Sequence, residues 1–225
     1  TVPWQYLFTR GMVIFILLNL YLYLEEGIEF ISNYKKIGVS GIIGSCGLAA
    51  AMITFIWSIT NTSAAITLLC LAAMPFITAL LGFLFLKETI SINVWAAIGI
   101  ATIGIIIMAI GNHEKNTFIG FVLGIVSAVG FSVFSVSLRW RKETPKFTTV
   151  ALAGLICLLV SLIVIINKDL SIFSSSKNQA LFAIHGTIVC LGMILYAIAS
   201  KNIPAAELTL LSLTEVIGGI FWVWL

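Results

Sequence analysis

The chain has 225 residues and is too apolar for an ordinary soluble domain. Hydrophobic residues make up 60% of it and charged residues 9%, and the mean hydropathy is +1.15. A soluble surface needs roughly a quarter of the residues charged. The net charge of +3 is small and scattered along the chain, which argues against binding to nucleic acid.

Eight long apolar segments predict an all-α, polytopic membrane protein. A hydrocarbon core of about 30 Å needs roughly 20 helical residues, and a helix satisfies its own backbone hydrogen bonds in lipid. The expected transmembrane helices are 4–24, 38–60, 63–86, 93–111, 117–139, 149–166, 180–200 and 203 to the end. Most charged residues fall in short connections, including a loop expected from Glu25 to Lys36.

The basic residues indicate the orientation in the membrane. The richer side of the expected spans holds eight of them: Lys35, Lys36, Lys87, Arg139, Arg141, Lys142, Lys146 and Lys201. The other side holds four: Arg10, Lys115, Lys168 and Lys177. Because cytoplasmic loops carry the excess of lysine and arginine, the richer side is expected in the cytoplasm. We expect a multi-pass integral protein of a bacterial inner (plasma) membrane.

An internal repeat emerges when residue n is compared with residue n + 141. The span 38–60 then falls on 179–201, and the span 63–86 falls on the final span. The comparison predicts two halves, 1–111 and 117–225, each lacking one of five helices. Eight helices would be visible of ten, and the odd number per half would invert the second half relative to the first.

Several short motifs resemble the EamA-type repeat of the drug/metabolite transporter superfamily, and the resemblance covers essentially the whole chain. They are Ser63-Ala64-Ala65 through Met74-Pro75, Leu86-Lys87-Glu88, and Gly104, with Gly120, Gly124 and Arg139 in the opening helix of the second half. Arg10 matches a recurrent arginine of the family's second helix. The family's first and last helices are expected to be absent.

Two positions depart from the family pattern. The usual Glu-Pro pair is Glu215-Val216 here, and a glycine of the fifth helix is Ala97. The resemblance implies export or exchange of small metabolites such as amino acids, or of drugs, with protons as a candidate coupling ion. A membrane-embedded sensory or binding module, and a nucleotide-sugar or lipid carrier, remain alternatives.

Two candidate site residues come from the repeat. Glu215 lies in the middle of its expected span, where a carboxylate is costly unless it faces a cavity or is protonated. It is either a cavity residue that contacts substrate or carries a proton, or a packing residue. Pro75 falls on Val216 under the shift, because 75 + 141 = 216. Proline bends its helix, and interrupted helices at matched positions point to a transporter site.

Three further residues complete the candidate substrate-binding set. His185 and Tyr196 share one face of the helix 180–200, because a step of 11 residues returns to nearly the same angle. His185 is either a cavity residue or a packing residue. Tyr196 is either a cavity residue or an anchor that forms a hydrogen bond to another helix. Arg10 either extends to the outer surface or acts at the outer mouth.

The sequence predicts no enzyme, cofactor or metal site. The two histidines, His113 and His185, have no metal-ligand spacing, and the sequence has no glycine-rich phosphate loop. The four cysteines, which all lie in apolar segments, are expected to be packing residues. The expected partners are the lipid bilayer and a small-molecule substrate, and the sequence does not fix the oligomeric state.

Overall fold

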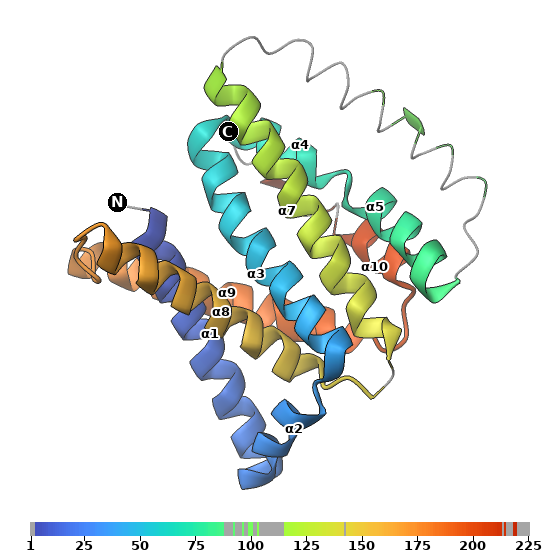
Figure 1. Cartoon of the computed structure of the whole chain (residues 1–225), viewed down its shortest axis with the longest axis horizontal. Coiled ribbons are helices and arrows are strands. Elements are labelled where there is room, and N and C mark those ends of the chain that lie inside the picture. Colours follow the sequence, from blue (N-terminus) through green and yellow to red (C-terminus); the bar gives the residue numbers. More distant parts are fainter. Residues whose placement is uncertain are drawn as a thin grey trace.

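The structure, a computed structural model, describes residues 3–87, 92, 96, 99–100, 103, 115–141, 143–212, 214 and 218–219. The regular elements within these residues are helical (Figure 1). They are α1 (Pro3–Glu26), η1 (Gly27–Glu29), α2 (Phe30–Lys36), α3 (Gly38–Asn61), α4 (Ala64–Leu71), α5 (Met74–Leu81), η2 (Gly82–Leu86), α7 (Lys115–Trp140), α8 (Lys146–Asn167), α9 (Ser176–Ala199) and α10 (Ala205–Leu211).

Six helical segments in the described residues are long and apolar enough to cross a membrane. They are Pro3–Lys36, Gly38–Asn61, Ala64–Leu86, Phe118–Trp140, Lys146–Asn167 and Ser176–Ala199. The all-α, multi-pass prediction is therefore confirmed for these six. Most of the expected span 93–111 and ten of the 23 residues from 203 to the end lie outside the described residues.

The loop expected from Glu25 to Lys36 is wrong, because the chain there is helical. The turn η1 and helix α2 follow α1 directly, with Gly27 at a φ of +61° where the direction changes. Tyr34 on α2 donates from its hydroxyl to Asn19 Oδ1 on α1 at 2.9 Å. The charges that suggested a loop instead mark the polar end of a helical hairpin.

The expected span 63–86 is interrupted where Pro75 was predicted to bend it. Helix α4 ends at Leu71, and α5 begins at Met74 with Pro75 in its first turn. Proline has no N–H to donate, and its ring clashes with the carbonyl four residues earlier, so the chain turns at Ala72 and Ala73. Next to the interruption, the hydroxyl of Ser132 on α7 lies 3.1 Å from the Met74 carbonyl and 2.8 Å from the carbonyl of Ala128 on its own helix, and donates between them.

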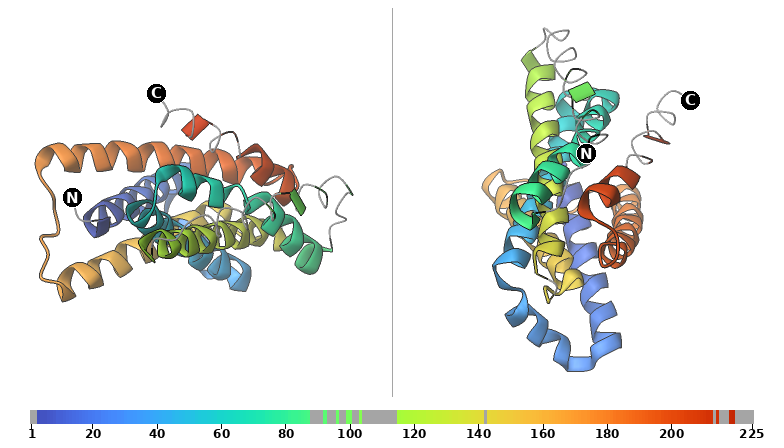
Figure 2. Two further views of the ribbon diagram at one scale, coloured as in Figure 1. Left: turned by 90° about the horizontal axis from the view of Figure 1, so that it is seen from above. Right: turned by 90° about the vertical axis from the view of Figure 1, so that its right-hand side faces the viewer.

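The long helices form two closely packed pairs, α3 with α7 and α1 with α8. Helices α3 and α7 run antiparallel, α1 crosses α8, and α9 lies against α1 (Figures 1 and 2). A Cβ atom built on Gly47 would lie 2.7 Å from the Gly130 carbonyl, and one on Gly11 would lie 2.7 Å from the Gly154 carbonyl. The helices therefore touch backbone to backbone at glycine, as membrane helices commonly do.

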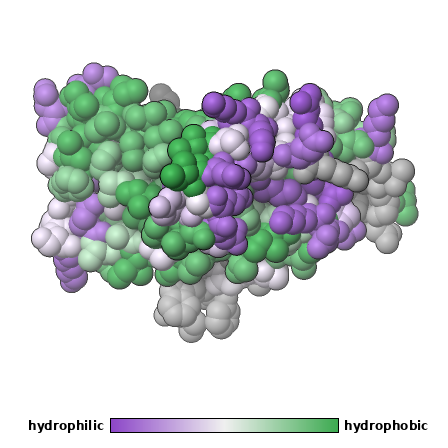
Figure 3. Space-filling view, turned by 90° about the horizontal axis from the view of Figure 1, so that it is seen from below, coloured by the Kyte–Doolittle hydropathy of each residue, from purple (hydrophilic) through white to green (hydrophobic). Residues whose placement is uncertain are grey.

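The outer surface of the described helices is largely apolar. On α9 the exposed side chains include Leu181, Ile184, Ile188, Leu191 and Leu195. Figure 3 shows that polar side chains gather in one region of the face that it presents, while much of the remainder is apolar. This surface suits a lipid environment, because hydrocarbon does not penalise exposed apolar side chains.

We predict that Gly130→Ala destabilises the protein, because the added Cβ would lie 2.6 Å from the Gly47 carbonyl and separate α3 from α7. Overpacking of this kind costs about 1–3 kcal/mol. Thermal unfolding in detergent measures the effect. The control is Gly192→Ala, since a Cβ there meets no atom within 4 Å. Equal melting temperatures for the two variants would contradict the glycine contact.

Candidate functional site

Arg10 is a buried cation in the contact between α1 and α9. Only 5% of its surface is exposed, and it lies about 10 Å along the helix from Pro3 at 1.5 Å per residue. Its Nη1 donates to the Tyr6 hydroxyl at 3.3 Å, and its guanidinium carbon lies 5.5 Å from the Tyr6 ring centre. Of the two alternatives for Arg10, the structure therefore disfavours extension to the outer surface.

Tyr6 connects Arg10 to His185. The Tyr6 hydroxyl and His185 Nδ1 are 2.7 Å apart. A guanidinium can only donate hydrogen bonds, so the Tyr6 oxygen accepts from Arg10 Nη1 while it is also hydrogen-bonded to His185. We call Tyr6, Arg10 and His185 the outer cluster.

Two further polar contacts hold the segments around the outer cluster together. Gln179 on α9 donates to Thr9 Oγ1 at 2.7 Å. Gln5 donates to the backbone carbonyl of Ser171 at 2.7 Å and to its hydroxyl at 2.8 Å. Gln179 Oε1 and Arg10 Nε are buried without hydrogen-bond partners in the described part of the chain. Unpartnered buried polar atoms are costly, so this region has unused capacity to bind a polar group.

Tyr196 lies in a different part of the molecule from the outer cluster. Its hydroxyl donates to Ser135 Oγ on α7 at 2.7 Å, and its ring packs on Phe131 and Phe134 at centre distances of 5.2 and 6.0 Å. Eleven residues separate it from His185, which is about 16 Å along a helix. His185 and Tyr196 therefore lie on the same face of α9, as predicted, but His185 contacts α1 and Tyr196 contacts α7.

Pro75 belongs to the same inner region as Tyr196. Ser132, which bonds the Met74 carbonyl beside Pro75, lies one helical turn from Ser135, which accepts from Tyr196. The predicted site residues thus divide into an outer group of Arg10 and His185 and an inner group of Tyr196 and Pro75. Glu215 lies outside the described residues. The proposed role of each residue in substrate binding stays a prediction.

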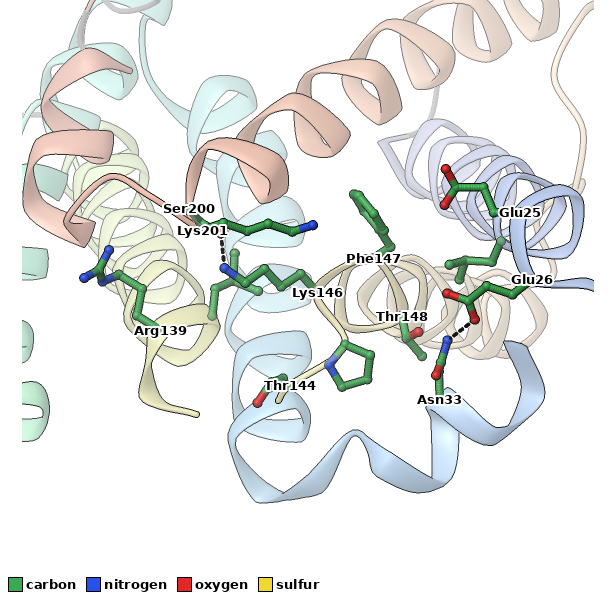
Figure 4. Close-up of a pocket in the computed structure, with 13 residues that line it drawn as sticks. Glu25, Glu26, Asn33, Arg139, Thr144, Lys146, Phe147, Thr148, Ser200 and Lys201 are labelled. Carbon is green, nitrogen blue, oxygen red and sulfur yellow. Dashed lines mark hydrogen bonds between the residues drawn. The ribbon is translucent and has the colours of Figure 1, made fainter. Parts of the chain in front are cut away.

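A cavity of about 620 Å³ lies at the other end of α1 from the outer cluster. Figure 4 shows its lining: Glu25 and Glu26 from the end of α1, Arg139 from α7, Lys146 from the start of α8, and Lys201 beyond α9. Of the predicted site residues, the four that the structure describes (Arg10, Pro75, His185 and Tyr196) do not line it. We call it the basic pocket, after Arg139, Lys146 and Lys201.

Sequence reasoning missed two features of these sites. Tyr6 could have been found, because it lies four residues before Arg10 and hence on the same helix face. The basic pocket could not, since its cations come from three separate segments and look in the sequence like ordinary membrane-flanking charges.

The comparisons with known proteins agree with the architecture. A search of curated protein sequences gives no match to this chain. Residues 2–110 match the model of the EamA-like transporter family. This confirms the resemblance read from Arg10, the segment around Pro75 and the Leu86-Lys87-Glu88 motif, which all lie within the matched residues. Residues 2–110 are thus similar to the EamA-like transporter family, and the six long apolar helices of the described residues indicate a multi-pass membrane protein.

Proposed function

We propose that the protein is a secondary transporter that moves a small metabolite, amino acid or drug across a bacterial inner membrane by alternating access. The observation that carries the proposal is the outer cluster, which buries an arginine between two apolar helices of a chain whose residues 2–110 match a transporter family. A charge within a membrane span is rare and usually belongs to a substrate or ion pathway.

The packing of the helices supports two inverted halves. Adding 141 to the bounds of α1 gives 144–167, against Lys146–Asn167 for α8. Adding it to α3 gives 179–202, against Ser176–Ala199 for α9. Helix α1 packs on α8, α3 packs on α8, and α9 packs on α1. Exchanging the two halves leaves this set of contacts unchanged, as expected for a pseudo-two-fold repeat.

The interruption at Pro75 fits the same scheme. Helix α4 ends at Leu71, and the shift places the corresponding end at 212, since 71 + 141 = 212. Helix α10 ends at Leu211, one residue from that position. Matched helix ends near the middle of the two halves favour a site where both helices are interrupted. In such a transporter the halves would rock about the crossing of α1 and α8.

The first test is transport itself. The protein would be reconstituted in liposomes, and uptake of labelled amino acids and of a cationic dye would be measured with and without a proton gradient. We expect flux of at least one compound above that of empty liposomes. Saturable binding without flux would instead support the sensory or binding module, and flux confined to nucleotide sugars or lipids would support the alternative carrier.

The outer cluster makes a sharper prediction. Tyr6→Phe removes the hydroxyl that joins Arg10 to His185 and leaves the packing unchanged. Hydrogen bonds to charged groups contribute about 1.5–3 kcal/mol, so we expect initial flux to fall about tenfold or more. Tyr23→Phe is the matched control, because Tyr23 is 50% exposed on the same helix. A folded Tyr6→Phe protein with normal flux would remove the outer cluster from the mechanism.

Glu215 is tested independently of the outer cluster. If its carboxylate carries a proton or contacts a cationic substrate group, Glu215→Gln abolishes proton-driven flux while the protein still folds. Glu29→Gln, at an exposed position on η1, controls for loss of one negative charge. Flux measured over a range of pH separates the roles, because only a proton carrier would change the pH dependence. Unchanged flux in Glu215→Gln would make Glu215 a packing residue.

A further inference from the structure

We propose that the basic pocket is a binding site for an oxyanion, a phosphate or carboxylate group held by Lys146, Thr148 and the N-terminus of α8. The proposal does not rest on transport, and its test measures binding alone. The chemistry is shared by a soluble phosphorylated or carboxylated metabolite and by the headgroup of an anionic lipid. The experiment below separates these two sources.

The first argument is the arrangement of charge in the basic pocket. Arg139, Lys146 and Lys201 line one side of it, and the two glutamates line the other, with Phe147 between them (Figure 4). Lys146 Nζ donates to Ser200 Oγ at 3.0 Å, and in the described part of the chain no carboxylate pairs with it. Cations gathered around one cavity repel one another, and a bound anion relieves that repulsion.

The other charged side chains of the basic pocket also have contacts that hold them in place. Arg139 Nη1 donates to the Ile203 carbonyl, so its charge is fixed at the wall of the cavity. Lys201 Nζ lies 6.0 Å from the Phe147 ring centre. On the opposite side Glu26 accepts from Asn33 Nδ2 at 2.6 Å and Glu25 accepts from the Tyr21 hydroxyl at 2.6 Å. The carboxylates are therefore engaged by neutral donors rather than by the lysines.

The second argument is the start of α8. Pro145 precedes this 22-residue helix and provides no capping side chain. The first N–H groups of a helix have no intrahelical acceptor, and together with the helix dipole they form an anion-binding site. Lys146, Phe147 and Thr148 are the first three residues of α8, and all three line the cavity. The start of α8 and the cations thus line the same cavity.

The third argument is the hydroxyl of Thr148. Thr148 lines the cavity, is only 1% exposed, and its Oγ1 is buried with no hydrogen-bond partner in the described part of the chain. A buried hydroxyl without a partner is costly. Its neighbour Thr149 behaves differently, because its Oγ1 donates to the Pro145 carbonyl at 3.0 Å. An oxyanion in the basic pocket would accept from Thr148 Oγ1.

The general excess of cytoplasmic cations does not account for these features. That rule explains why lysine and arginine flank membrane helices, and it covers Lys35 and Lys36 equally well. It does not explain a cavity of about 620 Å³, an uncapped helix start and an unpartnered buried hydroxyl at one place. A specific anion site explains all three.

The test uses the whole chain, purified in neutral detergent, and isothermal titration calorimetry. One arm titrates inorganic phosphate against chloride of equal ionic strength. The other titrates dihexanoyl phosphatidylglycerol against dihexanoyl phosphatidylcholine. We expect saturable binding of phosphate, of the anionic lipid, or of both. Phosphate without lipid identifies a soluble anion, and lipid with or without phosphate identifies a headgroup site.

Three variants make the result specific. Lys146→Gln should weaken binding about tenfold or more, as expected for loss of a charge-assisted hydrogen bond. Thr148→Val should weaken it several-fold without loss of folding, because the hydroxyl has no partner in the protein. Lys35→Gln removes a charge at an exposed position that does not line the cavity, and should bind normally. The proposal is overturned if neither probe binds saturably or if Lys35→Gln loses as much affinity as Lys146→Gln.

Discussion

The structure depends on one constraint, that a backbone N–H or carbonyl inside a bilayer has no water to bond. A continuous helix satisfies this constraint by itself, because its backbone groups bond one another. Every departure from a continuous helix therefore needs other hydrogen bonds. At the interruption before Pro75, turn hydrogen bonds within the chain provide such contacts, from the Ala73 N–H to the Cys70 carbonyl and from the Ile77 N–H to the Ala73 carbonyl, each at 3.1 Å. Ser132 on α7 also donates to the Met74 carbonyl at 3.1 Å, so α7 contacts the interrupted segment although 58 positions separate the two residues in the sequence.

The same constraint decides which parts of the fold could be predicted. Apolar segments of membrane-spanning length required helices, and five of the predicted spans agree with the observed ones to within four residues. The first, predicted over 4–24, lies within the longer segment Pro3–Lys36. The bend at Pro75 was predictable, because the missing N–H and the ring clash are properties of proline itself. The helical hairpin after Glu26 was not, because its stability comes from the contact of Tyr34 with Asn19. Charged residues in a connection do not reveal such a contact.

The site was less predictable than the fold, because its residues come together only in three dimensions. The rarity of an arginine in an apolar helix drew attention to Arg10, and helical spacing identified one face of α9. Neither signal indicated that Tyr6 joins Arg10 to His185, or that Ser135 on α7 accepts the hydrogen bond from Tyr196. The basic pocket combines the ends of α1, α7 and α9 with the start of α8, and no periodicity in the sequence connects these segments.

The attachment of α9 has a consequence for the outer cluster. Helix α9 packs chiefly on α1, with few contacts to α8, and its opposite face is exposed and apolar. His185 and Gln179 are two of its polar links to α1. The position of α9 and the surroundings of Arg10 are therefore thermodynamically linked. Any group that binds Arg10 more tightly when α9 is docked must hold α9 in place by the same free energy, so the buried arginine couples ligand binding to the position of a whole helix.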